Sequence, residues 1–159
     1  MEFRVADFEI LSFHSKVYQD GLKKIDERKQ EFIDKIEPIR KEMQKILLAS
    51  QSGLVIDKKT EQERAQRFQI LQEEAMSIDK DAKFHLSKQK DELTKETYNH
   101  LKEIIDEYSV NNSIDIVIGK LEIVYMNDKY EITNDILEIL KEKELYVEEK
   151  EEEKEEESV

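Results

Sequence analysis

The three histidines are the first candidates for chemistry, because the chain contains no cysteine. His14, His85 and His100 lie far apart in the sequence, and none has the close spacing of metal ligands on one helix. The serines and histidines form no recognisable nucleophile pattern, and no Gly-rich phosphate loop is present. We therefore predict a protein that is not an enzyme and that binds neither a metal ion nor a cofactor.

Carboxylates are abundant, but their number argues against a specific acid–base pair. The chain has 39 Asp and Glu against 26 Lys and Arg, a net charge of -13, and 41% of its residues are charged. At that density, neighbouring carboxylates are expected on any solvated helix face. The stretch 148–157 holds eight Glu and two Lys and contributes -6, so the remainder is near -7. Because phosphate binding needs clustered Lys and Arg, we exclude nucleic acid as a partner.

A heptad repeat organises the first half of the chain. From residue 22 the steps alternate between three and four residues, and seven of eight sites are apolar: Leu22, Ile25, Lys29, Phe32, Ile36, Ile39, Met43 and Ile46. The charged positions between them deny the helix the broad apolar face of a globular core, which favours a coiled-coil-like helix. Pro38 lies inside this helix and removes a backbone hydrogen bond, so we expect a bend that acts as a hinge.

A turn at 50–57 reverses the chain. We expect its apolar tip to consist of Gly53, Leu54, Val55 and Ile56, with the glycine as the C-terminal cap of the first helix. A second helix then begins near Asp57, or at Thr60 in a capping box with Glu63, and runs to about residue 108. Its apolar seam is weaker and uses Ala and polar residues. Asn111-Asn112-Ser113 follows as a helix break, so the two helices should pair as an antiparallel arm over 13–108.

Short β-like runs lie at both ends of this arm. Phe3–Ile10 reads as a strand, after which Ser12 can cap the first helix. Residues 114–118 and 121–126 alternate around Gly119-Lys120, which predicts a β-hairpin whose glycine has a positive φ angle. Thr133 then caps a last helix. We expect the apolar face of that helix to lie on the hairpin, through Ile136, Leu137 and Leu140.

The expected fold is α+β and mostly α, with a long antiparallel helical hairpin on a small β-sheet body and a short C-terminal helix. The body comprises 1–12 with 109–146, the arm 13–108, and an acidic disordered tail 147–159. A body of about 50 residues is marginally stable alone and leaves sheet edges open, which favours self-association. The copy number does not follow from these arguments.

The terminal segments resemble the Skp/OmpH family of bacterial holdase chaperones. The resemblance rests on Arg4–Ser12, on Ser113–Gly119 and on Val124–Leu137, and covers about residues 3–145. It implies a homotrimer with a small β-body and three helical arms that hold unfolded outer-membrane proteins without ATP. The body and its subunit contacts would then include Phe8, Ile116, Ile118, Ile123 and Tyr125. The chain departs from the best-known members of the family in being acidic.

Two functions remain open at this point. The first is the holdase, whose partners are its own copies and unfolded client proteins. The second is a structural or assembly protein, inside the cell or in a phage virion, that binds one folded partner. No stretch approaches the ~18 apolar residues of a membrane span, so we expect membrane contact to be peripheral at most. The first residues lack the features of a signal peptide. The periplasm is therefore expected if a signal has been removed, and the cytoplasm or a virion otherwise.

Overall fold

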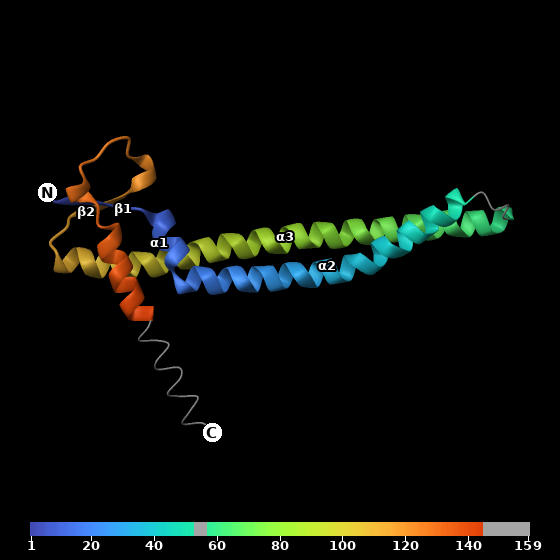
Figure 1. Cartoon of the computed structure of the whole chain (residues 1–159), viewed down its shortest axis with the longest axis horizontal. Helices are drawn as coiled ribbons and strands as arrows, with labels where there is room; N and C mark the ends of the chain where they lie inside the picture. The colour runs from blue at the N-terminus through green and yellow to red at the C-terminus, as the bar shows by residue number, and fades with distance from the viewer. Residues whose placement is uncertain (53–56, 145–159) are drawn as a thin grey trace, which may run out of the picture. The chain divides into compact units, whose positions relative to one another are not determined.

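The computed structural model describes residues 1–52 and 57–144. Its elements follow in the order β1, α1, α2, α3, β2, two short 3₁₀ turns and a C-terminal helix at 133–144 (Figure 1). The chain divides into two compact units. The base unit combines Met1–Leu22 with Glu92–Val159, of which the part up to residue 144 is described, and the hairpin unit is Lys23–Asp91. The predicted tip Gly53, Leu54, Val55 and Ile56 and the predicted tail 147–159 lie outside the described residues.

Two long helices form the antiparallel hairpin that the sequence predicts. Helix α2 is Lys16–Gln51 and helix α3 is Lys58–Asn111. Helix α3 starts at the first of the two predicted positions, because the Asp57 carboxylate accepts a hydrogen bond from the Thr60 N–H at 3.0 Å. It ends at the predicted Asn-Asn-Ser break, where Ser113 has a φ angle of 54°.

The packing of the hairpin unit follows the heptad pattern. Leu71 of α3 is almost fully buried. Four of the eight predicted seam residues of α2 are also buried: Ile25, Phe32, Ile36 and Ile39. Pro38 lies inside an α2 that continues without a break on both sides, and the predicted bend there stays a prediction. Arg67 adds a polar clamp across the hairpin, donating from Nε and Nη2 to the two Glu42 carboxylate oxygens at 2.6 and 2.8 Å.

The N-terminal prediction was wrong in its boundaries. Strand β1 is only Phe3–Ala6, and a separate short helix α1, Phe8–His14, occupies the rest of the predicted strand. Asp7 ends the strand because its side chain accepts a hydrogen bond from the Ile10 N–H, which makes it the N-cap of α1. Ser12 therefore lies within α1 and caps nothing, and the first long helix starts after a break at Ser15.

The predicted β-hairpin does not form. Strand β2, Ile116–Gly119, pairs with β1 in parallel, with Phe3 opposite Ile116 and Ala6 opposite Gly119. Gly119 has a φ angle of -67°, so it makes no hairpin turn, and a 3₁₀ turn at Lys120–Glu122 leads the chain away. The sheet has two strands instead of the expected three. A parallel pair needs a long crossover, and α1, α2 and α3 supply it.

The C-terminal helix completes the core of the base unit. Its first helical hydrogen bond runs from the Ile136 N–H to the Ile132 carbonyl, so Thr133 lies in the first turn and is not the cap. The core residues come from β1, α1, α3, this helix and the residue that directly precedes it: Ala6, Leu11, Leu101, Ile104, Ile105, Ile132, Ile136 and Leu140. The helix thus covers α1 and α3 instead of the predicted hairpin. Each fully buried side chain of this size contributes about 1.5–3 kcal/mol.

Among the residues that the structure describes, no helix combines the length and the apolar character that crossing a bilayer requires.

Candidate functional site

The histidines occupy three unrelated environments. A ring nitrogen of His14 lies 2.9 Å from the Ile10 carbonyl, and His85 stacks on Phe32. His100 Nε2 lies 4.0 Å from a Glu144 carboxylate oxygen. Within residues 1–52 and 57–144, no group of three His, Asp or Glu side chains is arranged to hold a metal ion. The surfaces of the two units are therefore the remaining candidates for function.

The hairpin unit exposes large apolar side chains outside its buried seam. They come from both helices and are spread along them, with one adjacent pair at 47 and 48: Ile33, Leu47, Leu48, Ile70, Met76 and Phe84. A shallow groove of about 140 Å³ runs beside the seam, with Phe32, Ile33, Ile78 and Leu86 among its walls. A second, more open hollow of about 560 Å³ lies on α3 around Met76. The chemistry of this surface suits many weak contacts with an extended apolar chain.

The groove has a cationic rim. The guanidinium carbon of Arg28 lies 5.3 Å from the centre of the Phe32 ring, and the Lys35 ammonium lies 5.6 Å from it. Lys29 and Arg40 also line the groove, against one acidic residue, Asp79. The lining and rim of the groove therefore hold more cations than anions, although the whole chain is acidic.

The charge of the hairpin unit explains this difference. Lys23–Asp91 holds 16 Lys and Arg against 14 Asp and Glu, a net charge of +2. The remaining residues hold 10 against 25, a net charge of -15. The acidity that distinguishes the sequence thus belongs to the base unit and the C-terminal residues, and the hairpin is close to neutral.

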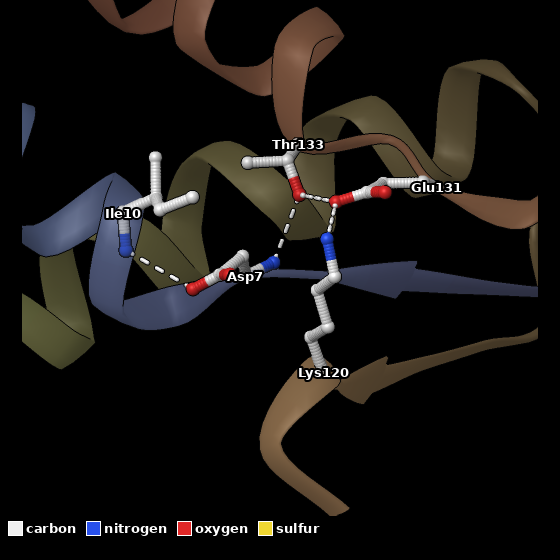
Figure 2. Close-up of polar contacts among 5 residues, drawn as sticks. All are labelled: Asp7, Ile10, Lys120, Glu131 and Thr133. Carbon is white, nitrogen blue, oxygen red and sulfur yellow. Dashed lines mark hydrogen bonds and ion pairs between the residues drawn. The ribbon is translucent and has the colours of Figure 1, made fainter. Parts of the chain in front are cut away.

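A polar network fixes the base unit around the end of its sheet (Figure 2). The Asp7 N–H donates to Thr133 Oγ1 at 2.9 Å, and that hydroxyl donates to Glu131 at 3.2 Å. Lys120 donates to the same Glu131 oxygen at 2.6 Å, and this hydrogen bond raises the pKa of the lysine. Figure 2 shows Lys120 reaching across from the end of β2. The network thereby anchors the point where residues 121–126 leave the sheet.

The predicted body residues differ in how much surface they present. Phe8 is half-buried at the start of α1 and stacks on Tyr98, with ring centres 5.8 Å apart. Ile116 and Ile118 leave 44% and 36% of their surface exposed on β2, and Ile123 is half-buried. Tyr125 is 85% exposed. All five belong to the base unit, and their part in subunit contacts stays a prediction.

Sequence reasoning missed an aromatic groove in the base unit. The groove has a volume of about 440 Å³, and its walls come from α1, α2, α3 and the turn after β2. Its apolar lining consists of Phe8, Phe13, Tyr18, Tyr98 and Leu121, with Glu9 and Ser12 among the polar residues. We call it the aromatic groove. Its residues are scattered over the sequence, so no spacing pattern could have revealed it.

Comparisons with known proteins agree with this architecture. The model of the family described as outer membrane protein (OmpH-like) matches residues 3–140. The chain is similar to a crystal structure from Caulobacter crescentus CB15, that of an OmpH-like outer membrane chaperone, with a TM-score of 0.66 and 12% sequence identity. The similarity covers 87% of this chain and 82% of that chain. At that identity it shows the fold alone. The curated proteins include no match.

Proposed function

Because this chain belongs to the family of OmpH-like outer membrane proteins, we propose that it is a periplasmic chaperone that binds unfolded proteins. More specifically, it acts as a holdase: it keeps unfolded outer-membrane-type proteins from aggregating, and it uses no nucleotide. The observation that carries this proposal is the surface of the hairpin unit, which exposes large apolar side chains although its seam is already buried.

The exposed residues support a mechanism of many weak contacts. Ile70, Met76 and Phe84 lie on one helix, each more than half exposed, and are separated by six and eight positions. One such side chain contributes little affinity alone. Several of them on one chaperone act together, because each contact raises the effective concentration of the next. Release then needs no chemical energy, since each contact breaks separately.

The distribution of charge supports the same clients. A chain of net charge -13 would repel acidic unfolded proteins if that charge were spread evenly. The hairpin unit carries +2, and cations surround its groove at Phe32. Overall acidity by itself favours the alternative function, a structural protein with a single folded partner. The near-neutral charge of the hairpin unit weakens that argument.

We also propose that the base unit assembles copies of the chain, as a homotrimer. Residues 121–126 have the alternating, β-branched sequence of a strand, but they pair with no strand of the described chain. Leu121, Val124 and Tyr125 are almost fully exposed there. A segment whose local preference is unsatisfied in one chain indicates that a partner satisfies it. The number three comes from the family resemblance.

Aggregation of an unfolded outer-membrane β-barrel protein, followed by light scattering without nucleotide, tests the holdase. The wild type should suppress scattering at near-stoichiometric ratio. The triple variant Ile70→Ser, Met76→Ser, Phe84→Ser should lose most of this activity and keep its helical content. The matched control is a second triple variant at exposed polar sites of the same helix, Gln62→Ser, Gln66→Ser and Gln72→Ser.

Two results would count against the holdase. If the wild type suppressed no aggregation across several clients and salt concentrations, the function would be rejected. If the apolar and the polar triple variants lost equal activity, the exposed side chains would not be the binding surface. Assembly is tested separately by the mass in solution, where a monomer at high concentration would contradict the trimer. Export is tested by locating the native gene product in periplasmic or cytoplasmic fractions.

A further inference from the structure

We propose that the aromatic groove of the base unit receives Tyr125 from a second copy of this chain. The inference rests on the assembly proposed above and names the contact that would hold it. It concerns only the base unit, to which both the groove and Tyr125 belong.

The lining of the groove selects an aromatic occupant with one polar end. Four aromatic rings form its walls, from Phe8, Phe13, Tyr18 and Tyr98. Aromatic rings pack on one another in offset or edge-to-face arrangements, which favours a further ring over an aliphatic chain. Glu9 and Ser12 also line the groove, and their oxygens can accept a hydrogen bond from a phenol. An uncharged side chain with a hydroxyl at its far end matches both features.

Tyr125 does not occupy the groove of its own chain. Tyr125 is 85% exposed and Val124 is 104% exposed, so neither fills the groove of its own chain. Leu121, which begins the same segment, already forms part of the groove wall. The groove and the unpaired segment are therefore adjacent parts of one surface. Two copies that meet at this surface can bury the segment of one in the groove of the next.

Such an exchange is head-to-tail, because a groove on one copy meets a different surface on its neighbour. Head-to-tail contacts close into a ring when the rotation between neighbours permits it. The start of the segment 121–126 is also held in place before a partner binds. The hydrogen bond from Lys120 to Glu131 holds the segment at its start, so less freedom is lost when Tyr125 is bound.

Cross-linking tests the contact directly, because the chain has no cysteine of its own. One full-length version carries Ser12→Cys, in the groove, and a second, with a different tag, carries Val124→Cys, beside an intact Tyr125. After the two are mixed and allowed to exchange subunits, a short bismaleimide should join them. The control pair combines Val124→Cys with Asn134→Cys, an exposed position on the C-terminal helix, and should not be joined.

Substitutions test the energy of the contact. Tyr125→Ser and Phe13→Ser should each raise the dissociation constant of the oligomer by about tenfold or more, as expected for a buried aromatic anchor. Tyr125→Phe should raise it by only about 2- to 10-fold, because it removes one hydrogen bond and keeps the ring. Val110→Ser removes another apolar side chain of the base unit, 80% exposed and outside the groove, and should leave the constant unchanged.

The outcomes separate this inference from the proposed assembly. Selective joining of the groove pair, with weakened assembly in both serine variants, supports the contact. If the oligomer is intact but the groove cysteine is not cross-linked to Val124→Cys of another copy, the proposed contact is wrong and the chaperone proposal still stands. A groove cysteine that reacts with bound client and never with a second copy also overturns the contact. A monomer under all conditions overturns the contact and the assembly together.

Discussion

Gly21 offers the sharpest test of how the base unit is packed. It lies in α2, where a Cβ atom built on its backbone would meet the side chain of Leu93 on α3. The built Cβ lies 2.1 Å from Leu93 Cδ1 and 3.0 Å from Cγ. Leu93 is only 6% exposed. Because carbon atoms pack at about 3.5–4.0 Å, the leucine must leave its place if residue 21 gains a methyl group.

The expected effect of Gly21→Ala is the sum of two opposed terms. Alanine is favoured over glycine inside a helix by about 1 kcal/mol. Forcing a methyl group into a filled space, which here pushes Leu93 off its rotamer, costs about 1–3 kcal/mol. The approach of 2.1 Å places this case in the upper part of that range, so we expect a net loss of about 1–2 kcal/mol in the free energy of unfolding. With a urea dependence of about 2 kcal/mol/M, the midpoint should fall by about 0.5–1 M.

Urea unfolding followed by circular dichroism measures this change, with all proteins at one concentration because assembly shifts stability. Gly119→Ala is the matched control. Its Cβ would lie 3.9 Å from Phe8, an ordinary contact, and its φ angle of -67° suits alanine. It should be neutral or slightly stabilising. A Gly21→Ala variant as stable as this control would refute the close helix contact. In the double variant Gly21→Ala, Leu93→Ala the two losses should be less than additive.

Three further predictions concern single side chains. The hydrogen bond from the Thr60 hydroxyl lowers the pKa of Asp57. The ionised Asp57 should therefore stabilise the fold at pH values above the usual Asp pKa, and this stabilisation should be lost as the pH falls through the lowered pKa. An NMR titration of the Asp57 carboxyl measures that pKa. Burial, followed by the hydrogen bond to Asp135, raises the pKa of Tyr108 to about 12, so the protein should lose stability as pH rises from about 10 to 12. Asp135→Asn should lower that pKa in an ultraviolet titration of tyrosinate. Leu71→Ala should destabilise the hairpin unit by about 2–5 kcal/mol, with faster hydrogen exchange along both helices as the readout.

The helical part of the fold could be predicted because its signals are local. The three- and four-residue steps from Leu22 to Ile46 mark one side of α2, and four of the eight residues on that side are buried in the structure. The cap at Asp57 and the helix break near Ser113 are equally local, since each depends on hydrogen bonds between residues at most five positions apart. For such features the sequence carries the physical cause itself.

The β-forming segments were found in the sequence, but their predicted pairing was wrong. A Gly-Lys pair between two alternating runs is a common hairpin signal, yet β2 pairs with β1 more than 100 residues earlier. A local rule cannot identify β1 as the partner of β2, because the helices between the two strands decide which strand edges meet. The boundary of β1 failed for a smaller reason, since the cap formed by Asp7 was overlooked.

The sequence by itself determined the two long helices, the heptad seam of the first and the family to which the chain belongs. These properties depend on residue types at short separations, which a linear reading contains. Only the tertiary structure decided the parallel sheet, the close approach at Gly21 and the aromatic groove. Each of these requires side chains from distant segments to share one volume, and no local pattern specifies which segments will do so.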